Sequence, residues 1–412
     1  MFEIFRLHHL FYVVFSLIVS TVIFLPSVRM KLGLVEIALL TAVYAVCFFR
    51  SQIPCIRRMI PPMLIYGLMC FLFGMPFQLK LGFLHPIMTL WIWVFPILMA
   101  TCLFERNSRK ERNIIIGYNL ILLLVVIIAT AKAMLIFPDI MRMLTAGTTE
   151  KSLAQSMAQM NVGGFGIAYG CGAILLVLVA LLMNYIHNNI TRTLLWGGIG
   201  LCGYIVLQAH FTTLLGLCIA GTAFILYIST DNPFTKIFCI LIALLLLVAI
   251  RPLMESIIDY YQGSAVANHL QDLYDSWFKG KEYHSYRNEY FMNGVNLFLT
   301  NPLLGVNITL PENHFAYIAS HSTVLGVATR SGIIGCFCYF YTYWIAAKNR
   351  IYKCSSPLRF RIYSPLIAYF LILSLLNPTE LDVFNYCVGF ISLVIISLIL
   401  KQNDNTETTL EE

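Results

Sequence analysis

The chain has 412 residues, of which 59% are hydrophobic and 11% are charged, and its mean hydropathy is +0.79. Soluble domains carry about 25% charged residues, so this composition excludes a soluble globule and indicates a polytopic membrane protein. The formal net charge of +7 follows mainly from the topology described below, so it does not indicate binding to nucleic acid.

Apolar runs long enough to cross the hydrocarbon core, which takes about 20 helical residues, occur twelve times. They lie near residues 8–28, 32–49, 60–77, 82–104, 113–135, 161–186, 194–209, 211–229, 237–250, 322–346, 364–377 and 383–400. We therefore expect an all-α membrane protein in four regions. These are a bundle of nine helices (1–250), a large polar loop with helices along the membrane surface (251–321), three more helices (322–400) and a polar cytoplasmic tail (401–412).

Lysine and arginine set the orientation, because positively charged short loops stay in the cytoplasm. With the N-terminus inside, sixteen of these residues fall on the inner side and six on the outer side. The segment 251–321 then lies outside the cytoplasm, which in a two-membrane bacterium is the periplasm. None of the twelve cysteines falls in this segment, so none is placed where oxidation would cross-link it.

The junction between the seventh and eighth predicted helices reads QAHFTTLLG and places His210 at the outer surface. A histidine at a helix end is as often an interfacial polar residue as a ligand. His210 is therefore a candidate substrate contact, with the interfacial role as its alternative.

Within the large loop, the sequence predicts two helices, over residues 267–278 and 285–299. Arg287 lies in the first turn of the second helix, where the helix dipole favours anions and an arginine gains nothing from it. Either the guanidinium and the helix N-terminus hold an anion together, or Arg287 pairs with Glu282 or Glu289.

His321 stands where the polar loop gives way to the next apolar run, and Ser320 is the expected N-cap of a helix that begins there. Arg330 points to the opposite face of such a helix. The residues within about 40° of the His321 direction are small or apolar: Leu325, Ala328, Gly332 and Gly335. This stripe predicts either a groove for a polyprenyl chain or a close contact between helices.

Near the end of the chain, NPTELD separates the last two predicted helices on the outer side and offers Glu380 and Asp382. These carboxylates either orient a sugar hydroxyl or belong to a solvated turn. The outer segments contain no aspartate-rich or His/Cys cluster with the spacing of metal ligands, so we expect neither a metal nor another cofactor.

Two stretches together resemble the bacterial O-antigen ligase family. His321-Ser322, nine further residues and then Gly332-Ile333-Ile334-Gly335 are similar to its signature, a histidine followed by Asn, Ser or Gln, nine residues and Gly-x-x-[Gly/Thr/Tyr]. Upstream, YRNEYFMNGVNLFLTNPLLGV resembles the family's loop segment, in which an arginine opens a helix that ends at Asn-Pro and a glycine turn. The similarity covers roughly a fifth of the chain, and related O-antigen and capsule polymerases share much of it.

The resemblance implies a glycosyltransferase of the GT-C type in the bacterial inner membrane, with its active site on the periplasmic face. Its donor would be O-antigen on undecaprenyl diphosphate, its acceptor a sugar of the lipid A core, and its reaction an inverting transfer without a metal. His321 and Arg287 would be catalytic. Together with the candidates found above, we expect five residues to contact substrate: His210, Ser322, Gly332, Arg330 and Glu380.

The chemistry of these residue types agrees with such a transfer. The guanidinium of Arg287 matches phosphate oxygens and stays charged as the diphosphate leaves. The imidazole of His321 has an ordinary pKa of about 6.5, so it can take the proton of the acceptor hydroxyl at neutral pH.

One feature departs from the family. Its members usually carry an arginine where His210 stands, whereas this chain has no arginine between Arg192 and Arg251. Either His210 or another outer cation takes that role, or the two sequences are aligned differently there.

A polymerase that joins lipid-linked repeat units is one alternative; the histidine signature favours the ligase, and the missing arginine weakens that preference. A lipid or sugar transporter is the other. The predicted helices are nearly free of charge, whereas ion-coupled carriers need ionisable groups at mid-membrane.

Overall fold

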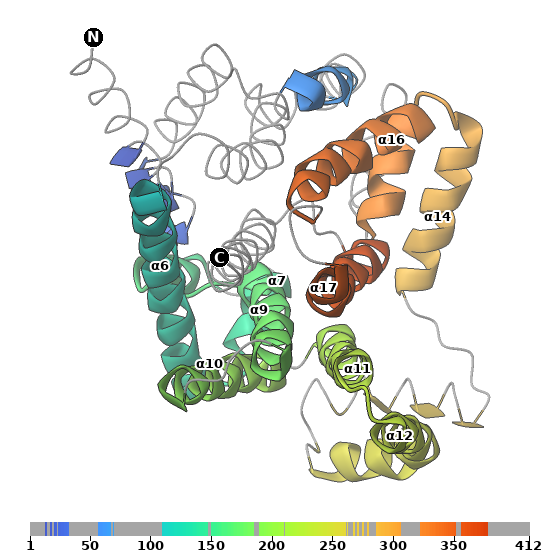
Figure 1. Ribbon diagram of the computed structural model, residues 1–412. Coiled ribbons are helices and arrows are strands. Elements are labelled where there is room, and N and C mark those ends of the chain that lie inside the picture. Colours follow the sequence, from blue (N-terminus) through green and yellow to red (C-terminus); the bar gives the residue numbers. More distant parts are fainter. Residues whose placement is uncertain are drawn as a thin grey trace.

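The computed structural model describes residues 13–14, 17–18, 20–22, 24–32, 57–66, 69, 109–146, 150–184, 189–209, 211–260, 262, 267, 270–271, 274–275, 278–279, 286–305, 322–351 and 356–377. In this part of the chain every regular element is a helix (Figure 1). The helices are α2 (Pro26–Leu32), α6 (Arg109–Ile136), α7 (Ile140–Ala146), α8 (Lys151–Gln159), α9 (Phe165–Asn184), α10 (Asn189–Gln208), α11 (Thr212–Ser229), α12 (Pro233–Tyr260), α14 (Tyr286–Thr300), α16 (Thr323–Ile351) and α17 (Ser356–Leu376).

Three stretches of the described helices are long and apolar enough to cross a membrane: Asn113–Ile136, Phe165–Asn184 and Asn189–Gln208. Two shorter apolar helices coincide with predicted spans, Thr213–Ser229 and Phe360–Leu376. An all-α chain compatible with a membrane protein is therefore confirmed for the described residues. The predicted spans 82–104 and 383–400, and all of 32–49 except its first residue, lie outside those residues, and the total of twelve stays a prediction.

Helix α9 forms the centre of the bundle and contacts α10, α11 and α17 (Figure 1). Its small residues allow this close approach: a Cβ on Gly172 would lie 2.6 Å from Leu214 Cδ1 and 2.8 Å from the Tyr369 hydroxyl. That hydroxyl donates to the Tyr169 carbonyl over 2.6 Å. The bond satisfies the buried Tyr369 hydroxyl, which would cost free energy if it were buried without a hydrogen bond. It also fixes α17 against α9.

Polar contacts join the ends of helices that are distant in the sequence. At one end of the bundle, Asn184 Nδ2 donates to Ser229 Oγ over 2.7 Å, and Arg361 Nη2 to Asp231 Oδ1 over 2.6 Å. At the other end, the Asn377 carbonyl accepts from the Thr323 N–H. These pairs mean that α9 and α11 run in one direction and α17 in the opposite one, as expected for helices that cross and recross a membrane.

Helix α12 corrects a predicted boundary. The expected span ends at residue 250, but the helix continues through Pro252 to Tyr260. Its 28 residues extend about 42 Å at 1.5 Å per residue, more than the roughly 30 Å of a hydrocarbon core. The last turns therefore project beyond the apolar part of the bundle, and they are polar enough to do so.

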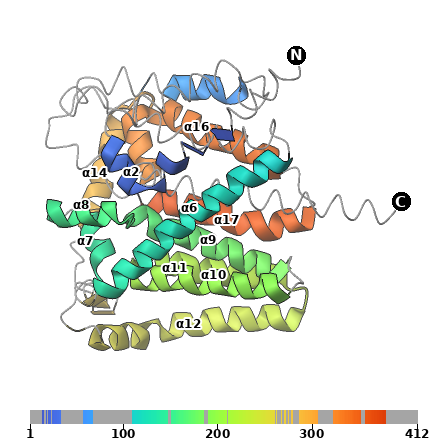
Figure 2. The same ribbon diagram turned by 90° about the vertical axis from the view of Figure 1, so that its left-hand side faces the viewer.

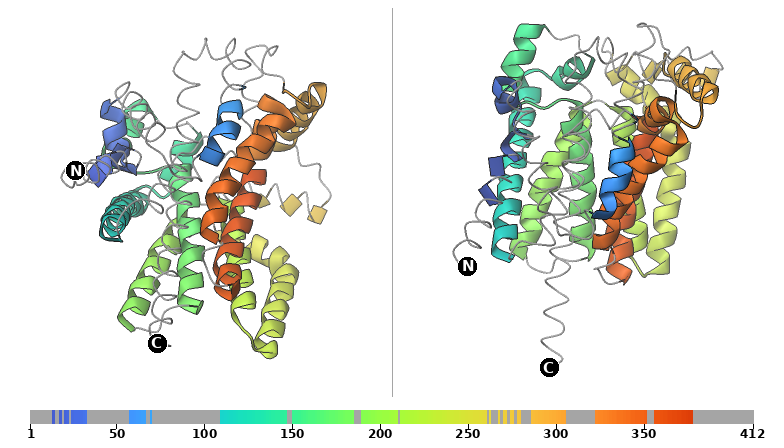
Figure 3. Two further views of the ribbon diagram at one scale, coloured as in Figure 1. Left: turned by 45° about the horizontal axis from the view of Figure 1, so that its top comes forward. Right: turned by 90° about the horizontal axis from the view of Figure 1, so that it is seen from above.

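Helices α9, α10, α11 and α12 run side by side along one axis, and α6 crosses them obliquely (Figure 2). Helices α8 and α14 both lie at the end of the bundle where α6 terminates, and the right-hand view of Figure 3 shows α14 at the same end. The predicted helix over 285–299 is confirmed as α14, and it belongs to this end of the molecule.

Candidate functional site

Helix α14 packs along the first part of α16, and the two run parallel. Gly294 lies against the Leu325 side chain, and Thr329 Oγ1 donates to the Gly294 carbonyl over 3.2 Å. Further along both helices, Ile333 N donates to the Pro302 carbonyl over 2.8 Å. The residue numbers of the contacting residues increase together along the two helices. The N-terminal ends of α14 and α16 therefore lie at the same end of the pair.

The N-terminus of α16 is fixed by a cap and by the end of α17. Ser322 precedes the first helical residue, and its Oγ accepts from Leu325 N over 3.2 Å. The main-chain carbonyl of Asn377 accepts from both Thr323 N and Thr323 Oγ1, over 3.0 and 2.9 Å. Both residues at the helix start are at least 96% buried, with Ser322 4% and Thr323 0% exposed.

This arrangement corrects the predicted cap. The sequence predicts Ser320 as the N-cap residue, but α16 begins at Thr323 and the capping hydroxyl is that of Ser322. The Ser322 hydroxyl also donates to the Ser374 carbonyl over 3.5 Å. Its hydrogen-bonding capacity therefore serves the helix end, which gives Ser322 a structural part at the site.

A kink interrupts α16 at Gly332, where φ is 64° and ψ is −170°. Only glycine adopts this region without strain. The turn that ends α14 occupies the space beside it: a Cβ on Gly332 would lie 2.1 Å from the Leu303 carbonyl oxygen and 2.5 Å from Leu304 N. Gly332 therefore allows the two backbones to meet.

The kink also overturns the single helical stripe predicted after His321. Leu325 and Ala328 belong to the first part of α16, whereas Gly335 follows the break and keeps no helical register with them. Of the two readings of the small residues, close backbone contact describes Gly332. Of the four residues of the predicted stripe, Ala328 lines the groove in this region, and the rest of that lining comes from other residues.

An open apolar groove of about 540 Å³ lies where α14 meets both parts of α16. Phe298 contributes from α14 and Ala328 from the first part of α16. The rest of the lining is apolar or aromatic and comes from the second part of α16: Ile333, Cys336, Phe337, Phe340, Tyr341 and Trp344. The groove thus begins beside the α14–α16 junction and continues along the bundle.

The structure describes only some of the predicted site residues. His321, His210 and Glu380 lie outside the described residues. Arg287 is the second residue of α14, and Arg330 lies in the first part of α16, but the described atoms do not include their side chains.

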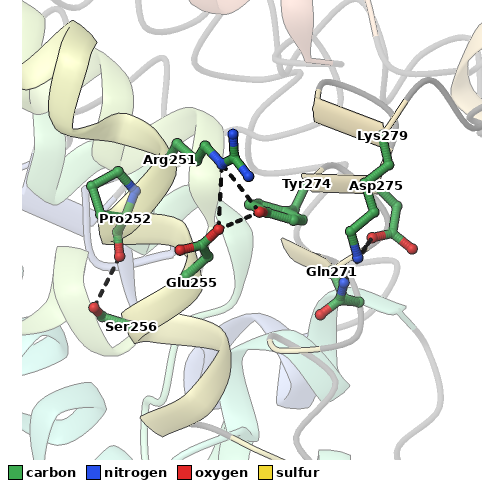
Figure 4. Close-up of polar contacts among 8 residues, drawn as sticks. All are labelled: Arg251, Pro252, Glu255, Ser256, Gln271, Tyr274, Asp275 and Lys279. Carbon is green, nitrogen blue, oxygen red and sulfur yellow. Dashed lines mark hydrogen bonds and ion pairs between the residues drawn. The ribbon is translucent and has the colours of Figure 1, made fainter.

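A polar cluster at the end of α12 was not singled out in the sequence (Figure 4). Arg251 Nε donates to Glu255 Oε1 over 3.4 Å and to the Tyr274 hydroxyl over 3.3 Å, and that hydroxyl donates to Glu255. The guanidinium also lies 6.0 and 5.7 Å from the ring centres of Tyr274 and Phe278. The cluster attaches the helical residues near 274 to α12.

Hydrogen bonds within this cluster shift the pKa values of its charged side chains. The bond from Tyr274, and after it the contact with Arg251, lowers the pKa of Glu255, while the Tyr274 hydroxyl and then Glu255 raise the pKa of Arg251. The bond to Asp275 raises the pKa of Lys279. The pKa of Glu255 is lower in the folded protein than in the unfolded chain. Its contribution to stability is therefore present above the unfolded pKa of about 4.3 and is lost as pH falls through the folded pKa.

Glu255→Gln should therefore loosen the segment that carries Tyr274. We expect amide hydrogen exchange around residues 270–279 to be roughly two- to fivefold faster than in the wild type at neutral pH, since exposed pairs contribute little. The ratio of the two rates should approach one as pH falls through the lowered pKa of Glu255, below its ordinary value of about 4.3. Asp259→Asn, which removes an exposed carboxylate one turn further along α12, should leave exchange unchanged; equal rates for Glu255→Gln and wild type at neutral pH would contradict the assignment.

Sequence reasoning also missed Asn377. Its carbonyl holds the start of α16, and the residue is 2% exposed. An asparagine directly before a proline, at the end of an apolar run, is a signal for a helix terminus. The partner at position 323 depends on tertiary packing and has no signal in the sequence.

No protein-family model matches the chain, and no curated protein matches it. Roles for the site residues therefore depend on the chemistry and geometry described above.

Proposed function

We propose that the protein is an O-antigen ligase, which transfers O-antigen polysaccharide from undecaprenyl diphosphate to the lipid A core. The proposal includes a GT-C architecture of about twelve spans in the bacterial inner membrane, with the active site on the periplasmic face. Its basis in the sequence is the resemblance centred on His321 and Arg287.

The observation that carries the proposal is the parallel packing of α14 and the first part of α16. Arg287 precedes Gly294 by seven residues, or roughly 10 Å of helix, and Gly294 lies against Leu325. Leu325 is only two residues from the start of α16, which follows His321 and Ser322 in the sequence. The end of α14 that carries Arg287 is therefore the end at which α16 begins.

In the proposed reaction the oxygen of the acceptor hydroxyl attacks the anomeric carbon of the donor sugar. The bond between that carbon and the diphosphate oxygen breaks, and undecaprenyl diphosphate leaves with the electron pair. Arg287 stabilises the charge that develops on the diphosphate. His321 accepts the hydroxyl proton. Attack opposite the leaving group inverts the anomeric configuration.

The apolar groove supports a lipid-linked donor. Its lining is almost entirely hydrocarbon and aromatic, and it starts near Ala328, in the helix that begins at the proposed site. Part of an isoprenoid chain can lie there while its diphosphate stays at the polar end of the bundle.

A strain from which the gene has been deleted tests the proposal. We expect its lipopolysaccharide to lose the long-chain ladder on a gel, while polymerised glycan accumulates on the lipid carrier. Expression of the wild-type chain should restore the ladder.

A different gel pattern would identify the related polymerase. If single repeat units remain attached to the lipid A core in the deletion strain, attachment does not require this protein and the ligase proposal is wrong. An unchanged ladder would exclude both activities.

A further inference from the structure

Asn377 carries a side-chain donor that has no partner among the described residues, at the start of α16. The residue is 2% exposed, and no hydrogen-bond acceptor for its Nδ2 is found within the described part of the chain. Both bonds to Thr323 use the main-chain carbonyl of Asn377. The side-chain amide is therefore available for another partner, and it lies in the residue that holds the helix N-terminus.

Asn119, which is buried, and Asn184, which is partly buried, give a comparison. Asn119 and Asn184 each donate Nδ2 to a carbonyl one turn earlier, over 2.8 and 2.9 Å, and leave only a carbonyl oxygen unpaired. Asn377 leaves the N–H donor unpaired instead. Because buried donors in folded proteins are nearly always paired, this one indicates an acceptor that is not part of the described chain.

The surroundings favour an anionic acceptor. Asn377 lies beside the N-terminus of the first part of α16, before the kink at Gly332, where the helix dipole places partial positive charge and attracts anions. The same end of the α14–α16 pair carries Arg287. An anionic oxygen would satisfy the amide and interact favourably with the helix end.

We propose that the Asn377 side-chain amide binds a phosphate oxygen of the lipid diphosphate donor. Asn377 is thus a substrate-binding residue that acts on the leaving group from the α17 side of the site. The identity of the donor rests on the proposed function, whereas the binding of a diphosphate by Asn377 can be measured separately.

The purified full-length chain in detergent, titrated with inorganic pyrophosphate, provides the first test. Asn377→Leu is similar in size and retains the main-chain carbonyl, and it should weaken pyrophosphate binding about tenfold or more, as expected for the loss of a donor to a charged group. Asn377→Asp should weaken it further, since its carboxylate repels the anion. Asn119→Leu, which removes a buried amide from α6, should bind as the wild type does.

Either of two results would overturn the inference: a wild-type chain that does not bind pyrophosphate, or an Asn377→Leu variant that binds it with wild-type affinity. Misfolding is separated from loss of binding because Asn377→Leu should keep the wild-type unfolding temperature within a few degrees in the absence of ligand. A large drop in that temperature would assign Asn377 a structural role instead.

Transfer assays distinguish this inference from the proposed function. With lipid-linked donor and lipid A core acceptor, Asn377→Leu should raise the KM for the donor about tenfold and leave the KM for the acceptor unchanged. Equal changes in both constants would contradict a role at the diphosphate. If the wild type binds pyrophosphate through Asn377 but transfers no glycan, the ligase proposal fails and the diphosphate site stands.

Discussion

Gly332→Ala should destabilise the protein by at least ~3 kcal/mol, because two costs add. An alanine at φ 64° and ψ −170° adopts a conformation that only glycine tolerates. Its Cβ would also lie 2.1 Å from the Leu303 carbonyl oxygen, and that atom belongs to a backbone turn that cannot rotate away. We expect a large fall in the unfolding temperature of the detergent-solubilised protein and little folded material after purification.

Gly203→Ala is the matched control. Gly203 lies within α10 and has no atom within 4 Å of the position of an added Cβ. Alanine forms helices better than glycine by about 1 kcal/mol, so this variant should be as stable as the wild type or slightly more stable. A Gly332→Ala protein with the unfolding temperature of Gly203→Ala would show that α16 does not need the kink.

The kink also determines where the groove lies. Ala328 lines it from one side of the break and Ile333 from the other, and Phe298 of α14 lies across from both. A straight α16 would not keep these three side chains together. Gly332→Ala protein that remains folded should therefore lose the proposed transfer activity, through weaker binding of the proposed lipid-linked donor.

The helices of the bundle were predictable because their signal is local. A run of about 20 apolar residues has few alternatives to a membrane-spanning helix, and α9, α10 and α11 fall within a few residues of the predicted runs. The extension of α12 past Pro252 was missed because the loop was assigned by its polarity. Helices that emerge from the bundle keep their backbone bonds while their side chains become polar, as at Glu255 and Asp259.

The candidate site was only partly predictable for a related reason. The helix that begins near Arg287 follows from its apolar spacing, and the structure contains it as α14. The conformation of Gly332 follows from a contact with Leu303, 29 positions away in the sequence, which no local pattern encodes. The unpaired amide of Asn377 likewise becomes visible only when the carbonyl of that residue is found on Thr323.

His321→Ala tests the chemistry rather than the fold. Loss of a general base lowers rates by about 10²- to 10⁴-fold, so we expect the lipopolysaccharide ladder to disappear and lipid-linked polymer to accumulate. His321→Gln should behave in the same way, because an amide can form hydrogen bonds but cannot accept the proton at neutral pH. His314→Ala, which changes a histidine seven positions earlier in the same segment, should retain the ladder.

The pH dependence of transfer adds a second measurement for His321. The rate of the wild type should fall as pH drops through the pKa of the imidazole, ordinarily about 6.5, because the protonated ring cannot act as a base. The residual rate of His321→Ala should lack this step, and added imidazole should restore part of the activity by supplying a base in solution. A variant that keeps both the ladder and the wild-type pH profile would exclude His321 as the base and, with it, the proposed reaction.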